Sequence, residues 1–441
     1  MAKAKTFFLD QHGCAKNQVD GEIIITRLVN LGLVQVSNAD DADLIIVNSC
    51  GFIESAKKES LDSLLNARSA YPEKKIILAG CLAERYAQVF KEDLPEADGI
   101  VGNGDLSLLD KAVKEVFSKA KKRPVFKGEQ KGVFCGERTE LLSYKGSAFV
   151  KITEGCDNCC AYCIIPKIRG GFRSKPMEDV VEEARQLAEA GCKELILIAQ
   201  DVTNYGRDLY GEPRLAELVR KVCRVDGIRW VRLMYCYEDR ITDKLIEVMA
   251  TEPKVCHYID IPIQHASDGV LKAMRRRSTE ESIKDTIKRL KAAIPDIHIR
   301  TTLIVGFPGE TEKDFDKLLD FVEEMRFARL GVFAYSQEEN TEAGEMENQI
   351  DEKIKRERLD AVMRRQLDIS LEYNKEKVGK ELEVLVEEAD EDGSYIGRTQ
   401  YDAPEIDNSV IFTSERELKA GDIVRVLVED AFDYDLVGRE V

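Results

Sequence analysis

The feature of this sequence that most constrains its fold is a regular alternation of short apolar runs with longer amphipathic runs. In the first third of the chain, three apolar runs each lead to a cysteine: KTFFLDQHGC to Cys14, ADLIIVNSC to Cys50 and KKIILAGC to Cys81. Short apolar runs favour buried strands, whereas the runs between them have the periodicity of helices. Strand–helix alternation is typical of a parallel sheet covered by helices. We therefore predict an α/β fold with an N-terminal parallel-sheet domain.

A second alternating block follows residues 121–145, which are charged, punctuated by glycine and proline, and predicted to be an interdomain linker. Two of its helical patterns carry capping-box signals, Ser278 with Glu281 and Thr311 with Asp314. Six strands are predicted in this block, near residues 148–153, 194–199, 229–235, 257–263, 297–305 and 329–335. Six strand–helix units are too few for a full eight-fold barrel, so we predict an open, partial (β/α)6 barrel.

The last part of the chain changes character again. Residues 351–376 contain neither glycine nor proline and are predicted to form one long charged helix. Residues 377–441 contain short alternating segments separated by turn residues, which predicts a small all-β barrel. We thus expect three domains, residues 1–135, 143–375 and 377–441.

The 12 cysteines call for a function of their own, since the chain has only 4 histidines. No apolar run approaches the roughly 20 residues that span a membrane. The N-terminus also lacks a secretory signal, so we expect a cytoplasmic protein without membrane contact. Thiols in a reducing compartment are more often metal ligands, reactive groups or buried apolar residues than disulfides.

Four of these cysteines lie in EGCDNCCAYCIIP, residues 154–166, and they can be grouped in two ways. Two CxxC pairs, Cys156 with Cys159 and Cys160 with Cys163, would supply four thiolates to zinc or to an iron–sulfur cluster. The pattern CxxxCxxC instead leaves Cys159 aside and supplies three thiolates to a four-iron cluster with one iron open. Spacing alone leaves both groupings, and simple burial of the thiols, as alternatives.

Cys14, Cys50 and Cys81 lie far apart in the sequence but occupy equivalent places in the predicted sheet. Each follows a predicted parallel strand, and the carboxyl ends of such strands line the edge where ligands bind. We therefore expect the three thiols to converge. The alternative is that each is a small buried apolar residue.

These motifs together resemble a known family. CxxxCxxC in a loop after the first strand of a partial barrel resembles the radical S-adenosylmethionine (SAM) superfamily. HGCAKNQVDGE, VNSCGFIESAKKES and AGCLAERY are similar to the N-terminal domain of its methylthiotransferases, and EGCDNCCAYCIIPKIRGGFRS is similar to their SAM loop. IPIQHASDGVLKAMRR, LIVGFPGET and FAYSQEENT resemble later barrel strands, so the similarity extends from about residue 6 to the C-terminus. Cys159 departs from the family pattern, which has a non-ligand residue there.

The resemblance implies a radical SAM methylthiotransferase that replaces a C–H hydrogen by a methylthio group. In this family SAM binds the open iron of one 4Fe–4S cluster, and a second 4Fe–4S cluster takes part in sulfur transfer. The implied cofactors are thus two 4Fe–4S clusters and SAM, with an electron donor such as flavodoxin or ferredoxin. The implied metal ligands form two trios: Cys14, Cys50 and Cys81, and Cys156, Cys160 and Cys163.

The family has branches that modify tRNA adenosine and branches that modify a ribosomal protein, and net charge helps to choose between them. The whole chain carries −17, and residues 377–441, which resemble a TRAM domain, hold 7 Lys or Arg against 18 Asp or Glu, a net charge of −11. Phosphate contacts need cations, so such a barrel suits a basic protein better than nucleic acid, unless the acidic residues only aid solubility. GCAKN, GRTQYDAPEIDNSV and YDLVG also resemble the ribosomal branch. That branch methylthiolates the β-carbon of an aspartate in small-subunit ribosomal protein twelve.

Five further residues are candidates for contact with SAM or substrate. Gln200 and Asp201 follow the second predicted barrel strand, where barrel enzymes place active-site residues. Gln264 follows the fourth strand, and Arg300 on the fifth can bind a carboxylate in fork geometry or form a structural ion pair. Gly306 in VGFPGET can allow close approach of the backbone to adenosine. This segment lacks the lysine of a nucleoside-triphosphate loop, which excludes that function.

A function from another class remains open, a zinc-stabilised binding module without catalysis. The other cysteines lack partners at ligand spacing and are predicted to pack in cores. They are Cys135, Cys192, Cys223, Cys236 and Cys256.

Overall fold

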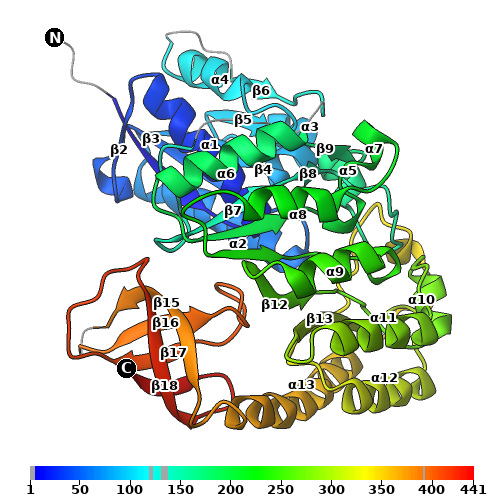
Figure 1. Cartoon of the computed structure of the whole chain (residues 1–441). Coiled ribbons are helices and arrows are strands. Elements are labelled where there is room, and N and C mark those ends of the chain that lie inside the picture. The colour runs from blue at the N-terminus through cyan, green and yellow to red at the C-terminus, as the bar shows by residue number, and fades with distance from the viewer. Residues whose placement is uncertain (1–4, 119–122, 131–137, 391–392) are drawn as a thin grey trace. The chain divides into compact units, whose positions relative to one another are not determined.

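The computed structural model describes residues 5–118, 123–130, 138–390 and 393–441, and the chain forms two compact units (Figure 1). Unit 1 consists of Met1–Leu142, Thr153–Asp157 and Cys163–Lys175. Unit 2 consists of the remaining segments, Ser143–Ile152, Asn158–Tyr162 and Pro176–Val441. The chain thus passes between the two units within the cysteine-rich segment.

Unit 1 contains the predicted parallel sheet. Its strands lie in the order β2-β1-β3-β4-β5-β6, and every neighbouring pair is parallel. The six strands are β1 (Thr6–Gln11), β2 (Val34–Gln35), β3 (Leu44–Ser49), β4 (Lys75–Gly80), β5 (Gly99–Gly102) and β6 (Val125–Phe126). Strands β1, β3 and β4, which precede the three cysteines, are adjacent in the sheet, so the predicted α/β arrangement is confirmed.

Helices connect these strands because amphipathic runs follow each strand in the sequence. They are α1 (Ala15–Asn30), η1 (Ala39–Asp41), α2 (Glu54–Ala70), α3 (Cys81–Asp93) and α4 (Leu108–Val116), and α5 (Ile165–Arg169) lies later in the chain, between β8 and β9. A short antiparallel pair, β8 (Thr153–Glu154) with β9 (Arg173–Ser174), completes the unit. Ile45, Val47, Ile76 and Leu78 of the central strands pack with Leu64 of α2 in one apolar cluster. Burial of these side chains is the main favourable contribution to the stability of the unit.

The predicted linker over residues 121–145 is wrong for much of its length. Strand β6 pairs with β5 as the last strand of the sheet. The guanidinium of Arg123 donates to the carbonyl oxygen of Leu94 at 2.6 Å, and that of Arg138 donates to the Glu22 carboxylate at 2.7 Å. A two-residue strand is too short to show a period, so composition misled the prediction. Residues 119–122 and 131–137, including Cys135, lie outside the described residues.

Unit 2 contains the second predicted sheet, with strands in the order β14-β13-β12-β11-β10-β7. All neighbours are parallel, and β14 and β7 are its edges, as expected for a partial barrel. The strands are β7 (Ser147–Lys151), β10 (Glu194–Ile198), β11 (Trp230–Leu233), β12 (Val255–Asp260), β13 (His298–Val305) and β14 (Arg329–Ala334). All six were predicted from the apolar runs.

The connecting helices follow the same alternation. They are α6 (Met177–Glu189), α7 (Arg207–Tyr210), α8 (Leu215–Cys223), α9 (Asp243–Thr251), α10 (Asp268–Ala273), α11 (Glu280–Ala293) and α12 (Glu312–Met325), with short η2 (Val202–Asn204), η3 (Glu238–Arg240) and η4 (Ala343–Glu345). The predicted capping box of Thr311 with Asp314 begins α12 and is confirmed. The box predicted at Ser278 is wrong by one residue, because Thr279 takes the extended backbone of the N-cap and pairs with Ser282.

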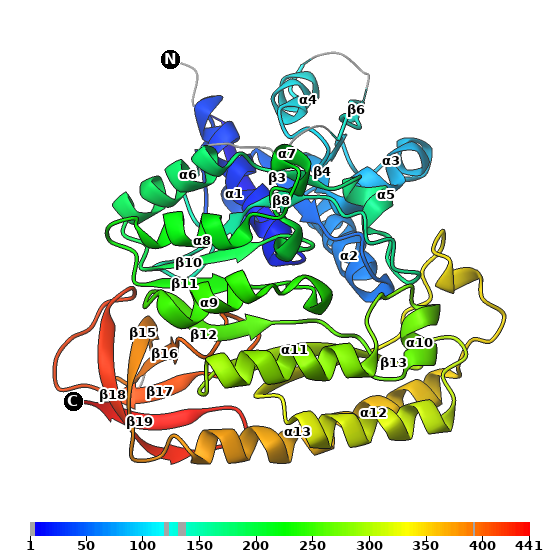
Figure 2. The ribbon, with the colours of Figure 1, turned by 45° about the vertical axis from the view of Figure 1, so that its right-hand side comes forward.

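The long helix α13 (Glu352–Lys375) follows the sheet and lies beside α12 (Figure 2). After it, five strands close into a barrel in the order β15-β16-β17-β19-β18, as predicted. They are β15 (Glu381–Ala389), β16 (Tyr395–Thr399), β17 (Val410–Thr413), β18 (Ile423–Ala431) and β19 (Leu436–Glu440). Alternate side chains such as Val384, Val386, Val426 and Val428 fill the barrel interior, which accounts for the period of two in the sequence.

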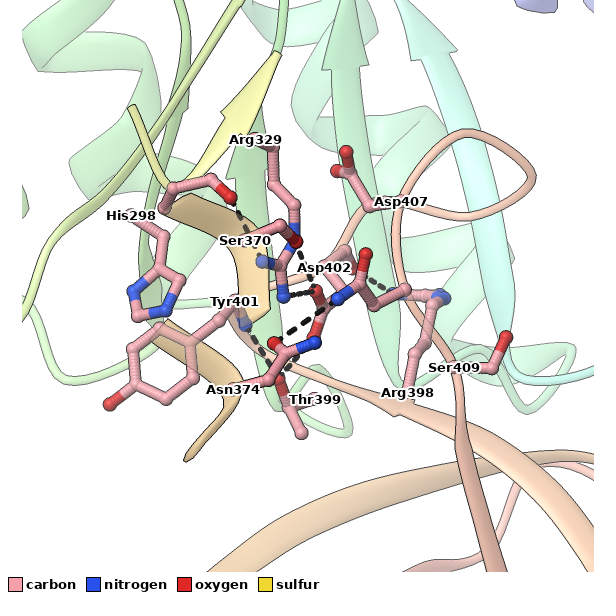
Figure 3. Close-up of polar contacts among 12 residues, drawn as sticks. His298, Arg329, Ser370, Asn374, Arg398, Thr399, Tyr401, Asp402, Asp407 and Ser409 are labelled. Atoms are coloured by element: carbon pink, nitrogen blue, oxygen red, sulfur yellow. Dashed lines mark hydrogen bonds and ion pairs between the residues drawn. The ribbon is translucent and has the colours of Figure 1, made fainter. Parts of the chain in front are cut away.

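The barrel is attached to the parallel sheet within unit 2 by buried charges (Figure 3). Arg329 of β14 donates to the Asp402 carboxylate at 2.6 Å, and Asp402 also accepts from the Thr399 hydroxyl at 2.6 Å. Arg398 of β16 forms a second buried ion pair with Glu194 of β10. Buried charges need such partners, so these pairs hold the barrel against the parallel sheet within unit 2.

Candidate active site

The three N-terminal cysteines all lie at the carboxyl edge of the sheet in unit 1. Cys14 is the N-cap of α1, Cys81 is the first residue of α3, and Cys50 directly follows β3. The backbone N–H groups of Asn17 and Gln18 donate to the carbonyl oxygen of Cys14 at 2.8 Å and 3.0 Å, and the N–H groups of Lys16 and Asn17 also lower the pKa of its thiol. The amino ends of helices favour anions, so this edge is suited to thiolates.

The three thiols lie within electrostatic range of one another. The charges of Cys14 and Cys50 each act on Cys81, and Arg169 acts on all three thiols. Gly13 has a φ of +90°, and a β-carbon there would lie only 3.0 Å from the β-carbon of Cys50, so glycine is favoured where this loop approaches Cys50. The structure therefore brings the predicted trio together.

The surroundings shift the pKa values of the three thiols in different directions. Neighbouring protein atoms oppose ionisation of Cys14, although its side chain still contacts solvent, but Lys16, Arg169 and the backbone N–H groups lower its pKa. Burial raises the pKa of the Cys50 thiol and raises that of Cys81 to about 12. A positive charge bound among them would reverse both increases.

Cys81 has the most elaborate surroundings of the trio. Its sulfur lies 3.2 Å from Nη2 of Arg169 and 3.2 Å from Nδ2 of Asn103. Arg169 also donates to Asp20 at 2.9 Å and to Glu154 at 3.0 Å. Both N–H groups are aimed at the sulfur, which is the arrangement expected around an anionic thiolate.

A second cluster stays a prediction here, and the donors available to it are three thiols. Among the residues that the structure describes, no three His, Cys, Asp or Glu side chains form a group that could hold one metal ion. A four-iron cluster binds each thiolate to a different iron, so its ligands need not meet at one point. Three thiols beside a buried guanidinium match that requirement in chemistry and charge.

The cysteine-rich segment is held at both ends within unit 1. The backbone N–H of Cys156 donates to the carbonyl oxygen of Gly170 at 3.1 Å, and Asp157 accepts from the N–H of Phe172 at 2.9 Å. Gly155 has a φ of +71°, and a β-carbon there would clash with the carbonyl oxygen of Gly171. Only glycine fits this crossing, which places Cys156 against the neighbouring strand.

The middle of the same segment is held within unit 2. The Asn158 amide donates to Asp201 at 3.0 Å and accepts from Arg240 at 2.8 Å, while Arg240 also pairs with Asp201. The Cys160 sulfur lies 3.4 Å from the Tyr237 hydroxyl. These side chains follow β10 and β11, so the carboxyl end of the parallel sheet positions this part of the cysteine-rich segment.

Arg276 stacks on the Tyr237 ring and brings a positive charge to the surroundings of Cys160. The guanidinium of Arg276 lies 4.1 Å from the centre of the Tyr237 ring and donates to Glu238 at 2.8 Å. Cys159, the neighbour of Cys160, is exposed and has a φ of +52°. The two adjacent cysteines therefore differ, since Cys160 is buried beside Tyr237 and Cys159 faces solvent.

The other predicted site residues have internal partners in unit 2. Asp201 is engaged by Asn158 and Arg240, and Arg300 binds Asp260 at 3.0 Å and Asp407 at 3.3 Å. Their roles toward SAM stay predictions. Arg300 in particular already has the structural ion pair that the sequence left as an alternative.

Gln200, Gln264 and Gly306 lie near the carboxyl ends of their strands, as predicted. Gln264 has a φ of +71°, and its N–H donates to the carbonyl oxygen of Thr302 at 2.9 Å. The N–H of Gly306 donates to Glu310 at 2.7 Å, and a β-carbon there would clash with the Lys355 side chain. The packing of Lys355 against the backbone thus explains why glycine occupies position 306, and contact of Gly306 with adenosine stays a prediction.

The sequence analysis did not identify Arg169, Asn103, Tyr237 or Arg240. Each is a single residue without a spacing pattern, and only folding brings it beside a cysteine or its loop. Arg169 lies in KIRGGFRS directly after the cysteine-rich segment, which was the one available signal.

Comparison with known sequences finds three families, each matching a separate part of the chain. The radical SAM superfamily pattern matches residues 150–322, the uncharacterized protein family UPF0004 matches residues 6–102, and the TRAM domain matches residues 378–441. Three families therefore account for most of the chain.

Similar full-length proteins decide the family. The chain is 48% identical over 434 residues to the ribosomal protein uS12 methylthiotransferase RimO of Clostridioides difficile, covering 98% of this chain and 97% of that protein. The chain belongs to the RimO family. RimO of Desulforamulus reducens is 47% identical, with 97% of each chain covered, and RimO of Geobacter sulfurreducens is 46% identical, with 97% and 96% covered.

Solved structures show where else the RimO fold occurs. The radical SAM methyltransferase TsrM from Kitasatospora setae matches with a TM-score of 0.55 at 13% identity, covering 75% of this chain and 73% of that one. The cobalamin-dependent SAM radical enzyme OxsB matches with a TM-score of 0.52 at 13% identity, covering 82% and 56%. At this identity the likeness concerns the fold alone.

Proposed function

We propose that this chain is a radical SAM methylthiotransferase that inserts a methylthio group at the β-carbon of an aspartate in ribosomal protein uS12. The observation that carries the proposal is the identity of 45–48% over nearly the whole length to proteins named for that activity. The tRNA adenosine alternative is not favoured, because these relatives are named for the ribosomal protein.

The first proposed metal site uses the pattern CxxxCxxC. Cys156, Cys160 and Cys163 would hold a 4Fe–4S cluster, and Cys159, which is exposed, would remain outside it because it does not belong to the CxxxCxxC pattern. When bound, such a cluster with SAM on its open iron supplies the electron that splits the SAM sulfonium. Within unit 2, Asn158, Asp201 and Arg240 orient the segment that carries Cys160.

The second proposed metal site uses Cys14, Cys50 and Cys81. Its support is the meeting of the three thiols at one sheet edge, with helix amino ends and the Arg169 guanidinium beside them. These positive groups would offset the negative charge of a thiolate-bound cluster. A second 4Fe–4S cluster in this position would serve sulfur transfer.

The substrate proposal rests on charge as well as on the relatives. Acidic side chains are exposed around the barrel, including Glu388, Asp390, Glu415 and Glu417. Such a surface attracts a basic ribosomal protein and repels the phosphates of RNA. The electron donor would be a small redox protein such as flavodoxin or ferredoxin.

Among the described residues, no helix combines the length and apolar character needed to cross a membrane.

Parallel assays test this function. The anaerobically reconstituted protein is incubated with reductant and labelled SAM, either with purified ribosomal protein uS12 or with tRNA. We expect label as a methylthio group in the protein substrate. Label that enters only tRNA would refute the assignment, and a preparation with zinc but no acid-labile sulfide would refute the enzyme class.

The predicted domains, residues 1–135, 143–375 and 377–441, are also part of the proposal. Their support is the position of the three family matches, 6–102, 150–322 and 378–441. Expression of residues 377–441 alone, followed by thermal unfolding, tests whether the barrel is an independent folding unit.

A further inference from the structure

Cys81 differs from the other two N-terminal cysteines in the donors that surround its sulfur. Arg169 Nη2 and Asn103 Nδ2 each lie 3.2 Å from it, from two different segments of unit 1. Only 6% of Cys81 is exposed, so water does not compete strongly for the sulfur. Cys14, in contrast, is exposed to solvent.

Arg169 is held firmly in this position. Its side chain is 2% exposed, and it donates to Asp20 at 2.9 Å and to Glu154 at 3.0 Å. The same helix is tethered by Gln130, which donates to the carbonyl oxygen of Ile168 at 2.6 Å. Two carboxylates accept from the guanidinium, and the second N–H of Nη2 points to the sulfur.

Asn103 has a simpler set of contacts. Its Nδ2 group donates to the Cys81 sulfur, and Oδ1 is buried. An asparagine in the loop after β5 thus directs its amide donor to the sulfur. An apolar side chain of similar volume would fill the same space and remove that donor together with the buried Oδ1.

We propose that Arg169 and Asn103 are positioning residues that hold the Cys81 thiolate and raise the reduction potential of the N-terminal cluster. The inference rests on the proposed function of the cysteine trio. One-electron reduction adds one negative charge to a cluster and its thiolates, with the electron coming from an external reductant. N–H groups aimed at a ligand sulfur stabilise that added charge, and hydrogen bonds to sulfur are a main determinant of cluster potential.

The test isolates the N-terminal cluster. The triple substitution Cys156→Ala, Cys160→Ala and Cys163→Ala removes the other trio from the full chain. The reconstituted protein is titrated with dithionite, and the reduced cluster is followed by electron paramagnetic resonance. We expect Asn103→Leu to decrease the reduced-to-oxidised ratio at fixed potential about tenfold, which is about 59 mV for a one-electron couple.

Two further variants separate the hydrogen bond from general loosening. Arg169→Lys keeps the charge but loses the planar fork, so we expect a shift in the same direction as for Asn103→Leu. Gln130→Leu removes a tether of the same helix without removing a donor to the sulfur, and we expect a clearly smaller shift than for Asn103→Leu. An equal shift in Gln130→Leu would overturn the inference.

The outcomes distinguish this inference from the function on which it rests. A triple variant that binds no iron and sulfide would overturn the N-terminal cluster and this inference with it. A loaded cluster whose potential ignores Asn103→Leu would overturn this inference and leave the cluster in place.

Discussion

At the residue scale, the Tyr237 hydroxyl lies beside the cysteine-rich segment. The Tyr237 hydroxyl is 3.4 Å from the Cys160 sulfur, and Arg276 stacks on the same ring. A hydroxyl directed at a ligand thiolate donates a charge-assisted hydrogen bond. We therefore expect the Tyr237 hydroxyl to raise the reduction potential of the SAM cluster through a hydrogen bond to a ligand sulfur, as proposed for Asn103 at the N-terminal cluster.

Tyr237→Phe removes that donor and keeps the ring under Arg276. We expect the SAM cluster to become harder to reduce, with the reduced-to-oxidised ratio at fixed potential about tenfold lower. Potentiometric titration in the background Cys14→Ala, Cys50→Ala and Cys81→Ala measures it. Tyr373→Phe is the control, since its hydroxyl donates to the Arg326 carbonyl instead. Equal potentials in both variants would contradict the role of Tyr237.

The cysteines themselves give a second prediction at this scale. Cys163→Ala should abolish SAM cleavage, because it removes a ligand of the cluster that binds SAM. Cys50→Ala should retain part of the cleavage but form no methylthio product. Chromatography of 5′-deoxyadenosine and mass spectrometry of the ribosomal protein measure the two reactions. Cys159→Ala should leave both intact, and methylthio product from Cys50→Ala would contradict the second cluster.

At the scale of elements, the helices begin where side chains satisfy their free N–H groups. Thr311 accepts from the N–H of Asp314 at 3.3 Å, and Asp314 accepts in return from the N–H of Thr311 at 3.0 Å. Both residues close the first turn of α12, which packs beside α13. The reciprocal pair therefore determines where this helix starts.

Thr311→Ala should lower the free energy of unfolding by about 1 kcal/mol, because it removes the cap of α12. Thr311 is exposed, so little packing is lost with it. Thr311→Ser keeps the hydroxyl and should lie close to the unchanged protein. Urea denaturation measures both variants, and similar losses in the two would show that the cap contributes little.

At the scale of the whole molecule, the attachment of the barrel to the parallel sheet in unit 2 depends on buried charge (Figure 3). Burial opposes ionisation of Glu194, but Arg398 and Arg232 hold its pKa at about 2. Arg398 also pairs with Glu387 of β15. Four strands from the barrel and the sheet thus share one network, so that removal of one partner leaves other charges uncompensated.

Arg398→Met should therefore destabilise the protein by about 3 kcal/mol or more, since two carboxylates lose a buried partner. The double variant Arg398→Met with Glu387→Gln should recover part of the loss, because one of those carboxylates is then neutral. Chemical denaturation gives both values. A loss below about 1 kcal/mol in the single variant would mean that water reaches this network.

His298 makes the same junction sensitive to pH. Its ring lies 4.3 Å from that of Tyr401, and burial, with Lys377 and Arg329 nearby, lowers its pKa to about 3 despite Asp402. An unfolded histidine has a pKa near 6.5, so the unfolded state binds more protons between pH 3 and pH 6.5. This histidine therefore makes the free energy of unfolding fall as the pH decreases through that window.

The expected loss from His298 at pH 5, relative to pH 7, is about 2 kcal/mol at 1.36 kcal/mol per pKa unit. His298→Asn does not titrate and should lack this part of the pH dependence. Urea denaturation at both pH values compares the two proteins. Equal pH dependence would show that His298 is protonated without cost in the folded state.

The sequence by itself determined the elements and the family of this protein. Strands β1, β3 and β4, the six strands of the second sheet and the five of the barrel follow from periodicity, because burial of one face repeats every two or 3.6 residues. The two cysteine trios were implied by the resemblance to the family, since spacing alone left two groupings of the four cysteines in residues 154–166 open. The capping box of α11 was missed by one residue, since Ser278 and Thr279 are both good N-caps and backbone conformation chooses between them.

The tertiary structure alone decided which side chains meet. Arg169 lies 88 residues from Cys81, and Arg398 lies 204 residues from Glu194, yet each pair is in contact. No local period encodes such pairs, because they arise only after burial brings the segments together and each buried charge must find a partner. Because a buried charge needs a partner, Arg300 pairs with Asp260 and Asp407, and Asp201 contacts Asn158 and Arg240. The sequence could not tell such structural contacts from contacts with a ligand.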